Sequence, residues 1–268
     1  MSAPVPQLPG SPSPEPENEV KLTFLEHLRE LRKRILRALV GIAVGMAAVG
    51  AFVERLYHWL MQPVVAALPP GRQMLVFTSA IEPMMVYIKV AIYGGIFVSA
   101  PWVLYQVWQF VAPGLYKKEK RVVVPFLAWG TVLFYAGAAF CFWLVLPAAF
   151  PAMLAFADQS ILTPMLSQSE QLGIVLAMLL GFGVVFEVPV IIAFLSMIGL
   201  VSADFLAKYR RHAIVVNTLL AAIITPTGDP FNLALMAVPM ILFYEIGIIL
   251  ARVLGKKRPA PGTALAAK

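Results

Sequence analysis

Charged residues are scarce in this chain of 268 residues: Asp, Glu, Lys and Arg together make up only 13% of it. A soluble domain carries ~25% charged residues. Here 60% of the residues are hydrophobic, which excludes an ordinary soluble domain and indicates that most of the chain faces lipid. Since helices satisfy their own backbone hydrogen bonds inside a bilayer, the sequence predicts an all-α integral membrane protein.

Cysteine and catalytic motifs are also scarce. The single cysteine, Cys141, lies in an apolar run, so no intrachain disulfide can form and the residue is interpreted as a small buried hydrophobe. No GxxxxGKS, GxxxxGKT, HExxH or GxSxG sequence occurs. This excludes a P-loop ATPase, an HExxH metalloprotease and a GxSxG serine hydrolase. The three histidines lie in flanks and loops, and Ser99 has no base at the same depth. We therefore predict a protein that is not an enzyme and uses no cofactor or metal.

Six apolar runs are present, and a bilayer-spanning helix needs ~20 residues. They lie at about residues 35–53, 84–107, 123–146, 172–199, 212–224 and 231–251. The turn TPTGDP separates the last two, and the apolar part of the fifth extends only ~18 Å. We predict six transmembrane helices in a cupped arrangement, with the fifth and sixth short, because prolines in the runs kink helices. A re-entrant hairpin over residues 212–251 is the alternative.

Lys and Arg concentrate on one side of these runs. That side holds six in the N-terminal flank, four in residues 117–121, three in residues 200–212 and five in the C-terminal tail. The alternate loops hold two, Arg55 and Arg72. Because basic flanks stay cytoplasmic, we predict that both termini are cytoplasmic. The net charge of +7 is then explained by topology, and no nucleic acid partner is needed.

The ends of the chain differ in composition from the part between them. Residues 1–20 hold six prolines and are predicted to form a disordered tail, and residues 255–268 a second, basic disordered tail. The six-helix membrane domain is predicted to occupy residues 21–254. At its start, residues 24–35 have one apolar face, which predicts an amphipathic helix on the inner surface before the first span.

Three acids stand out by their positions. Glu30 lies on the polar face of the amphipathic stretch, where an ion pair with Arg34 at i+4 is the simplest interpretation. Glu187 lies near the middle of the fourth run, where an ionised carboxylate costs several kcal/mol unless paired or hydrated. It is predicted to be protonated or to face a water-filled concavity, and it is a candidate functional residue. Asp229 is placed to cap the last helix, ahead of Pro230.

The stretch LYKKEKR at residues 115–121 places one acid, Glu119, among four cations. The cations suit a cytoplasmic loop. The acid either relieves repulsion among them or accepts a cationic ligand, since a carboxylate offers two oxygens to a guanidinium. The cations repel a generic basic peptide, so only a ligand with short, directed contacts would be held.

Five segments occur in the order and spacing of one known family. They are HLRELRKRI, SAPWVLYQVWQFVAPGLYKKEKR, FGVVFEVPV, TPTGDPF and AVPMILFYEIG. On these segments the chain resembles the TatC family, the receptor and core subunit of the twin-arginine protein translocase, over residues 21–252. The resemblance implies six helices in a cupped arrangement, both termini in the cytoplasm, and transport of folded proteins driven by the proton-motive force.

The resemblance also implies roles for single residues. Two acids, Glu30 and Glu119, would read the twin-arginine motif of a signal peptide at the cytoplasmic surface. Glu187 matches an intramembrane acid facing the concavity, and Pro63 lies in the outer cap. Other positions that match the signal-peptide surface are Arg32, Gln106, Phe110 and Lys117. The region where a partner helix docks is matched by Ala222, Ile223, Thr225 and Asp229.

The partners implied by the resemblance are single-span proteins of the TatA and TatB types, twin-arginine signal peptides of folded substrates, the lipid bilayer, and further copies of this chain in a homo-oligomer. The location would be the bacterial cytoplasmic (inner) membrane. Two other classes stay open: a proton-coupled transporter of small solutes that uses Glu187, and a structural membrane scaffold. A transporter is expected to show internal repeats, which the sequence lacks, and a scaffold would leave Glu119 without a ligand.

Overall fold

The computed structural model describes residues 16–69, 71, 74–111, 120–156, 164–225 and 229–255. The helices, in chain order, are α1 (Pro16–Gly50), α2 (Val53–Leu60), α3 (Gln62–Ala67), α4 (Glu82–Val111), α5 (Lys120–Phe140), the π-helical turn η2 (Cys141–Val145), α6 (Leu146–Ala155), α7 (Gln168–Met197), α8 (Ala203–Lys208), α9 (Arg210–Ile224) and α10 (Pro230–Leu254). Among the described residues, the one β pairing is an isolated bridge between Val76 and Ser167. The predicted all-α class is confirmed.

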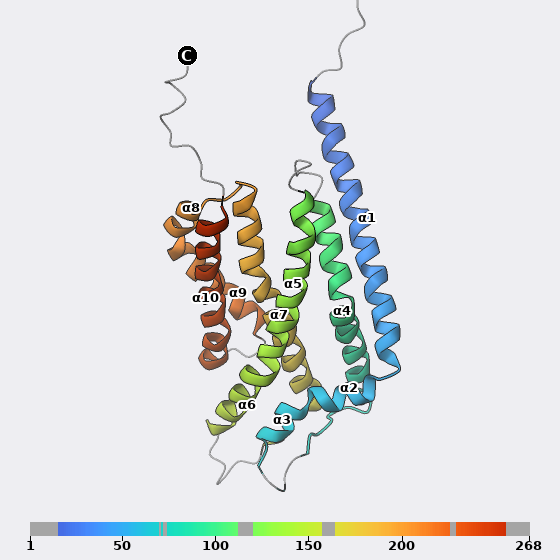
Figure 1. Ribbon diagram of the computed structural model, residues 1–268. Helices are drawn as coiled ribbons and strands as arrows, with labels where there is room; N and C mark the ends of the chain where they lie inside the picture. Colours follow the sequence, from blue (N-terminus) through green and yellow to red (C-terminus); the bar gives the residue numbers. More distant parts are fainter. Residues whose placement is uncertain are drawn as a thin grey trace, which may run out of the picture.

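Four stretches of the described chain are helical, long and apolar enough to cross a bilayer. They are Glu82–Phe110, Val124–Ala155, Gln168–Met197 and Pro230–Leu254. A fifth candidate is Leu25–Gly50 taken together with Val53–Ala67, two segments that are bent by 89° relative to each other. Because of this bend, α2 and α3 run across the end of the bundle instead of extending α1 (Figure 1). The prediction of an integral membrane protein is therefore confirmed.

The last two predicted spans differ in length. α9 has 15 residues and extends ~22 Å, less than the ~30 Å hydrocarbon core, so the prediction of a short fifth helix is confirmed. α10 has 25 residues and can cross a bilayer, so the prediction of a short sixth helix is wrong. The apolar run at 231–251 already holds 21 residues, enough for a span, and α10 extends it at both ends, from Pro230 to Leu254. Six crossings in a cupped arrangement stay a prediction.

α1 is one unbroken helix of 35 residues, ~52 Å long. The prediction of a separate amphipathic helix on the membrane surface is therefore wrong. No Pro or Gly interrupts residues 17–40, so the polar stretch continues directly into the apolar one and projects past the other helices (Figure 1). Because α1 begins at Pro16, residues 16–20 of the predicted tail are helical. Residues 1–15 and 256–268 lie outside the described residues.

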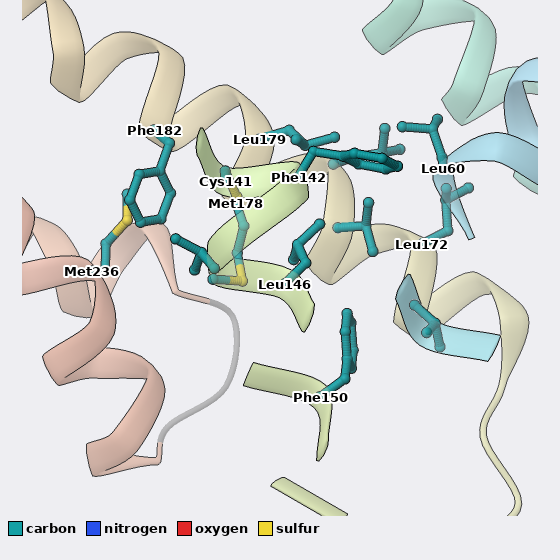
Figure 2. Packing of buried hydrophobic residues seen from close by; sticks show 14 of the residues in the cluster. Leu60, Cys141, Phe142, Leu146, Phe150, Leu172, Met178, Leu179, Phe182 and Met236 are labelled. Carbon is teal, nitrogen blue, oxygen red and sulfur yellow. The ribbon is translucent and has the colours of Figure 1, made fainter. Parts of the chain in front are cut away.

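The start of α1 and the end of α10 lie at the same end of the molecule, and α3 and α6 lie at the other (Figure 1). We call the first the basic end, because Arg29 and Arg32 lie in the N-terminal half of α1 and Arg252 lies in the last turn of α10. We call the second the cap end. The main buried cluster joins α2 and α3 to α4, η2, α6, α7 and α10. Figure 2 shows Cys141 within this cluster, fully buried, which confirms its interpretation as a small hydrophobe.

α1 and α4 approach each other closely at glycines. The GxxxG spacing of Gly41 and Gly45 permits such an approach. A Cβ built on Gly45 would lie 2.7 Å from the backbone oxygen of Gly95, and one built on Gly41 would meet the ring of Trp102. The indole of Trp102 also donates a 2.9 Å hydrogen bond to the backbone oxygen of Arg37. These contacts fix α1 against α4 and so position the polar groups at the basic end.

We expect Gly45→Ala to destabilise the protein by ~1–3 kcal/mol, because the added methyl meets backbone that cannot move aside. Thermal unfolding of the purified protein in detergent measures the change. Gly50→Ala is the control, since no heavy atom lies within 4 Å of a Cβ built there. Equal melting temperatures for the two variants would contradict the close α1–α4 contact.

Candidate functional site

Four polar side chains meet between α1 and α4 near the basic end: Glu30, Arg34, Gln106 and Gln109, which we call the α1–α4 cluster. Arg34 Nη2 lies 3.0 Å from Glu30 Oε1, which confirms the ion pair expected from their i+4 spacing. The same guanidinium donates to Gln106 Oε1 over 3.4 Å and to Gln109 Oε1 over 3.5 Å. Three side-chain oxygens from two helices thus converge on one guanidinium.

The cluster is partly buried and extended by two rings. Gln106 is only 2% exposed, so the α1–α4 contact holds its amide in place. His27 of α1 stacks on Phe110 of α4 with ring centroids 4.3 Å apart. Three of the residues predicted to share one surface, Glu30, Gln106 and Phe110, therefore lie along the same helix contact.

The other residues predicted for this surface do not join the cluster. Arg32 is exposed on α1 and lies two positions after Glu30, on another face of the helix. Lys117 and Glu119 lie outside the described residues. Gln109 was missed by the sequence reasoning, although it follows Gln106 at i+3 on the same face of α4.

Glu187 of α7 is buried against α5, with an exposed fraction of 6%. A Cβ built on Gly130 of α5 would lie 2.8 Å from Glu187 Oε2, so the carboxyl occupies the space left by the missing side chain. Its Oε1 has no hydrogen-bond partner among the described residues. An open carboxyl oxygen at this depth can accept a hydrogen bond from a polar group that approaches α5 and α7.

The C-terminal turn of α9 exposes apolar side chains next to a buried threonine. Ala222 and Ile223 are exposed, and Ile223 is 70% exposed. Thr225 is buried, and its Oγ1 has no hydrogen-bond partner among the described residues. Asp229 Oδ1 accepts a 2.8 Å bond from the backbone N–H of Asn232, which confirms the predicted cap.

Glu82, at the start of α4, is a buried acid at the cap end that the sequence reasoning missed. Its Oε2 accepts from the backbone N–H of Thr78 over 2.6 Å and from the Thr78 hydroxyl over 2.9 Å. Its Oε1 accepts from the Ser167 hydroxyl over 2.7 Å and from the backbone N–H of Ser169 over 3.0 Å. One carboxylate therefore ties the start of α4 to the start of α7.

Neighbouring side chains reinforce this junction. Lys89 Nζ donates to Ser169 Oγ over 2.8 Å, and the Tyr57 hydroxyl donates to Gln168 Oε1 over 3.1 Å. Pro63 lies buried in the first turn of α3, where its missing N–H costs no helical hydrogen bond. Pro63 lies at the cap end, and its predicted place and role in an outer cap stay predictions.

The long apolar helices and the sparse polar clusters define a multi-pass helical membrane protein. In the part of the chain that the structure describes, no three His, Cys, Asp or Glu side chains are grouped to hold a metal ion. The family model described as "Sec-independent protein translocase protein (TatC)" matches residues 26–239. The chain belongs to the TatC family.

The sequences of individual relatives align with this chain over most of their own length. The chain is 41% identical to a Sec-independent protein translocase protein TatC of Koribacter versatilis, covering 85% of this chain and 84% of that protein. It is also 41% identical to one of Desulforapulum autotrophicum, covering 90% and 88%. It is 34% identical to one of Aquifex aeolicus, covering 88% and 98%. These proteins are named as translocase components, so the chain is a transport protein and not an enzyme.

Solved structures show the same fold. A crystal structure described as the twin arginine translocase receptor TatC superposes with a TM-score of 0.77 at 34% identity, covering 85% of this chain and 99% of that one. A second, of the receptor in DDM, gives a TM-score of 0.76 at 33% identity, covering 86% and 100%. The resemblance noted in the sequence is therefore confirmed at the level of family and fold.

Proposed function

We propose that this chain binds twin-arginine signal peptides at its basic end as the receptor and core subunit of a twin-arginine translocase. The observation that carries the proposal is the α1–α4 cluster. It combines the carboxylate of Glu30 with the amide oxygens of Gln106 and Gln109, and these three oxygens already surround one guanidinium. Guanidinium groups match carboxylate oxygens in charge and geometry. Glu119 is proposed as the second acid of the site.

The proposed orientation follows from charge. In the sequence, Lys and Arg concentrate on the side of the apolar runs to which the N-terminal half of α1 belongs, so the basic end is proposed to face the cytoplasm by the positive-inside rule, with both termini cytoplasmic. The relatives that match are bacterial proteins, so the proposed location is the bacterial cytoplasmic (inner) membrane. Signal peptides on folded substrates then meet Glu30 from the side on which they are made.

Single-span proteins of the TatA and TatB types are the proposed partners, with transport driven by the proton-motive force. Support comes from the exposed Ala222 and Ile223 beside the buried Thr225, because small and apolar side chains next to a polar group favour helix packing in lipid. Further copies of this chain are proposed to join the same complex.

The signal-peptide site is tested by photo-cross-linking a labelled twin-arginine peptide to the protein in membranes. A charge-assisted contact is worth ~1.5–3 kcal/mol, so Glu30→Ala and Glu119→Ala are each expected to reduce capture roughly tenfold or more. Glu26→Ala, which removes an exposed acid one turn earlier on α1, is the matched control. Undiminished capture by both Glu30→Ala and Glu119→Ala would exclude the proposed site.

A cell-based assay separates this function from the two other classes. The chain is expressed in cells that lack their own TatC, together with a folded reporter that carries a twin-arginine signal peptide. Export of the reporter is expected. A proton-coupled transporter of small solutes or a purely structural scaffold would leave the reporter in the cytoplasm.

A further inference from the structure

A groove of about 650 Å³ runs along one side of the contact between α1 and α4, and we call it the apolar groove. Its α1 wall follows the i, i+3, i+4 spacing of a single helix face from Lys33 to Ala48. Between these two residues the helix rises ~22 Å. The α4 wall is formed by Val98, Ser99 and Trp102. The groove is therefore long and narrow, and it extends from the basic end into the apolar part of the molecule.

The polar groups that the groove offers to a ligand are two cations. The Ser99 hydroxyl already donates to the backbone oxygen of Gly95 over 2.7 Å. The Trp102 indole likewise donates to the backbone oxygen of Arg37 over 2.9 Å. Lys33 and Arg37 are exposed, and neither side chain has an ion-pair partner among the described residues. The groove is thus apolar along its length and positively charged at one end.

Both cations lie at the depth expected for lipid headgroups. The apolar run of α1 begins at about residue 35, between them. Trp102 lies beside Arg37, and indoles are enriched at the interface between membrane and water. Beyond this level the α1 wall continues through Val40 and Val44. One leaflet is half of the ~30 Å hydrocarbon core, so a groove of ~22 Å is long enough for an acyl chain of that leaflet.

The width of the groove distinguishes between a lipid chain and a partner helix. A volume of about 650 Å³ spread over ~22 Å leaves a mean cross-section of ~30 Å². A helix with its side chains is ~10–12 Å across, which corresponds to ~80–110 Å². A whole helix is therefore too wide to enter the groove, whereas a flexible hydrocarbon chain is thin enough to lie in it.

We propose that the apolar groove binds one anionic phospholipid. The phosphate of the headgroup contacts Lys33 and Arg37, and an acyl chain lies along Val40, Val44 and Val98. Basic pockets between transmembrane helices bind anionic headgroups in this way. The bound lipid would contact both α1 and α4 beside the glycines that bring these helices together. This inference does not rest on the binding of signal peptides.

Native mass spectrometry of the full chain, delipidated in detergent, tests the headgroup contact. It gives the dissociation constants of phosphatidylglycerol and of phosphatidylcholine with identical acyl chains. The parent is expected to bind one phosphatidylglycerol roughly tenfold more tightly than phosphatidylcholine, because two cations face the headgroup. Lys33→Gln combined with Arg37→Gln is expected to remove most of this preference.

Lys208→Gln combined with Arg211→Gln is the matched control. It also removes one lysine and one arginine, and both side chains are exposed and lie outside the groove. The control is expected to keep the preference of the parent. If it loses as much of the preference as the groove variant does, the preference follows from net charge alone and the inference is wrong. The inference is also wrong if the groove variant keeps the preference of the parent.

Photo-cross-linking tests the position of the acyl chain in the folded parent background. A photo-reactive amino acid replaces Val44, which lines the groove, or Val132 of α5, which is also exposed but lies outside it. The protein is placed in vesicles that hold equal amounts of the two phospholipids. Adducts at Val44 are expected to be enriched in phosphatidylglycerol, whereas adducts at Val132 should match the composition of the vesicle.

Two results of the cross-linking would overturn the inference. Equal lipid compositions in the adducts at Val44 and Val132 would show that the groove holds bulk lipid without selection. In native membranes, a protein adduct at Val44 in place of a lipid adduct would show that a partner helix or a second copy of this chain covers the groove. Both results leave the proposed binding of signal peptides untouched, because that function is measured separately.

Discussion

Replacing Glu82 with alanine is expected to lower the melting temperature of the purified protein by several degrees and to reduce the amount of folded protein in the membrane. The carboxylate accepts four hydrogen bonds from Thr78, Ser167 and Ser169 at a buried junction. Alanine leaves these donors without their acceptor, and unsatisfied buried donors are costly. The starts of α4 and α7 also lose the group that joins them. Glu82→Gln keeps one acceptor oxygen and should lose less stability.

Glu54→Ala is the control for this prediction, because Glu54 is an exposed acid in the first turn of α2 toward the same end of the molecule. Its melting temperature should match that of the parent. Ser167→Ala should cost stability in the parent but little in the Glu82→Ala background, since its acceptor is already gone. Additive effects of the two substitutions, or equal melting temperatures for Glu82→Ala and Glu54→Ala, would show that the carboxylate does not join the two helices.

Local patterns predicted the parts of this fold that depend on neighbouring residues. Apolar length located the spans, and Asp229 followed by Pro230 predicted the start of α10. The i+4 spacing of Glu30 and Arg34 predicted their ion pair. Each of these features depends on residues that lie close together in the chain, so the local sequence is enough to predict it.

Contacts between distant segments could not be predicted in this way. Ser167 lies 85 residues from Glu82, and nothing in either local sequence relates them. Gln106 reaches Arg34 across 72 residues because glycines bring α1 against α4. The helical continuity of α1 was missed for a different reason. A change from polar to apolar composition marks the membrane surface, but it does not break a helix where Pro and Gly are absent, as they are from residues 17–40.

The role of Glu187 is best tested by moving its carboxyl without removing it. Gly130→Ala adds a methyl whose nearest neighbour is the end of the Glu187 side chain, 2.8 Å away, and that flexible end can move aside. Alanine also favours a helix over glycine by ~1 kcal/mol. We therefore expect Gly130→Ala to retain the melting temperature of the parent and yet to lose most of its export of a twin-arginine reporter. A steric defect in packing would instead lower both together.

Three variants complete this test. Gly173→Ala makes the same substitution in α7, where no heavy atom lies within 4 Å of the added Cβ, and should export like the parent. Glu187→Ala should lose export, and Glu187→Gln should retain part of it, because an amide oxygen still accepts the hydrogen bond left open at Oε1. If Glu187→Ala and Glu187→Gln both export like the parent, the acid has no part in transport. If Glu187→Ala fails to export while Gly130→Ala exports normally, the carboxyl is required but its position against α5 is not. A carboxyl that titrates or binds water can still act after a small shift. A carboxyl that makes a directed hydrogen bond to a partner helix cannot.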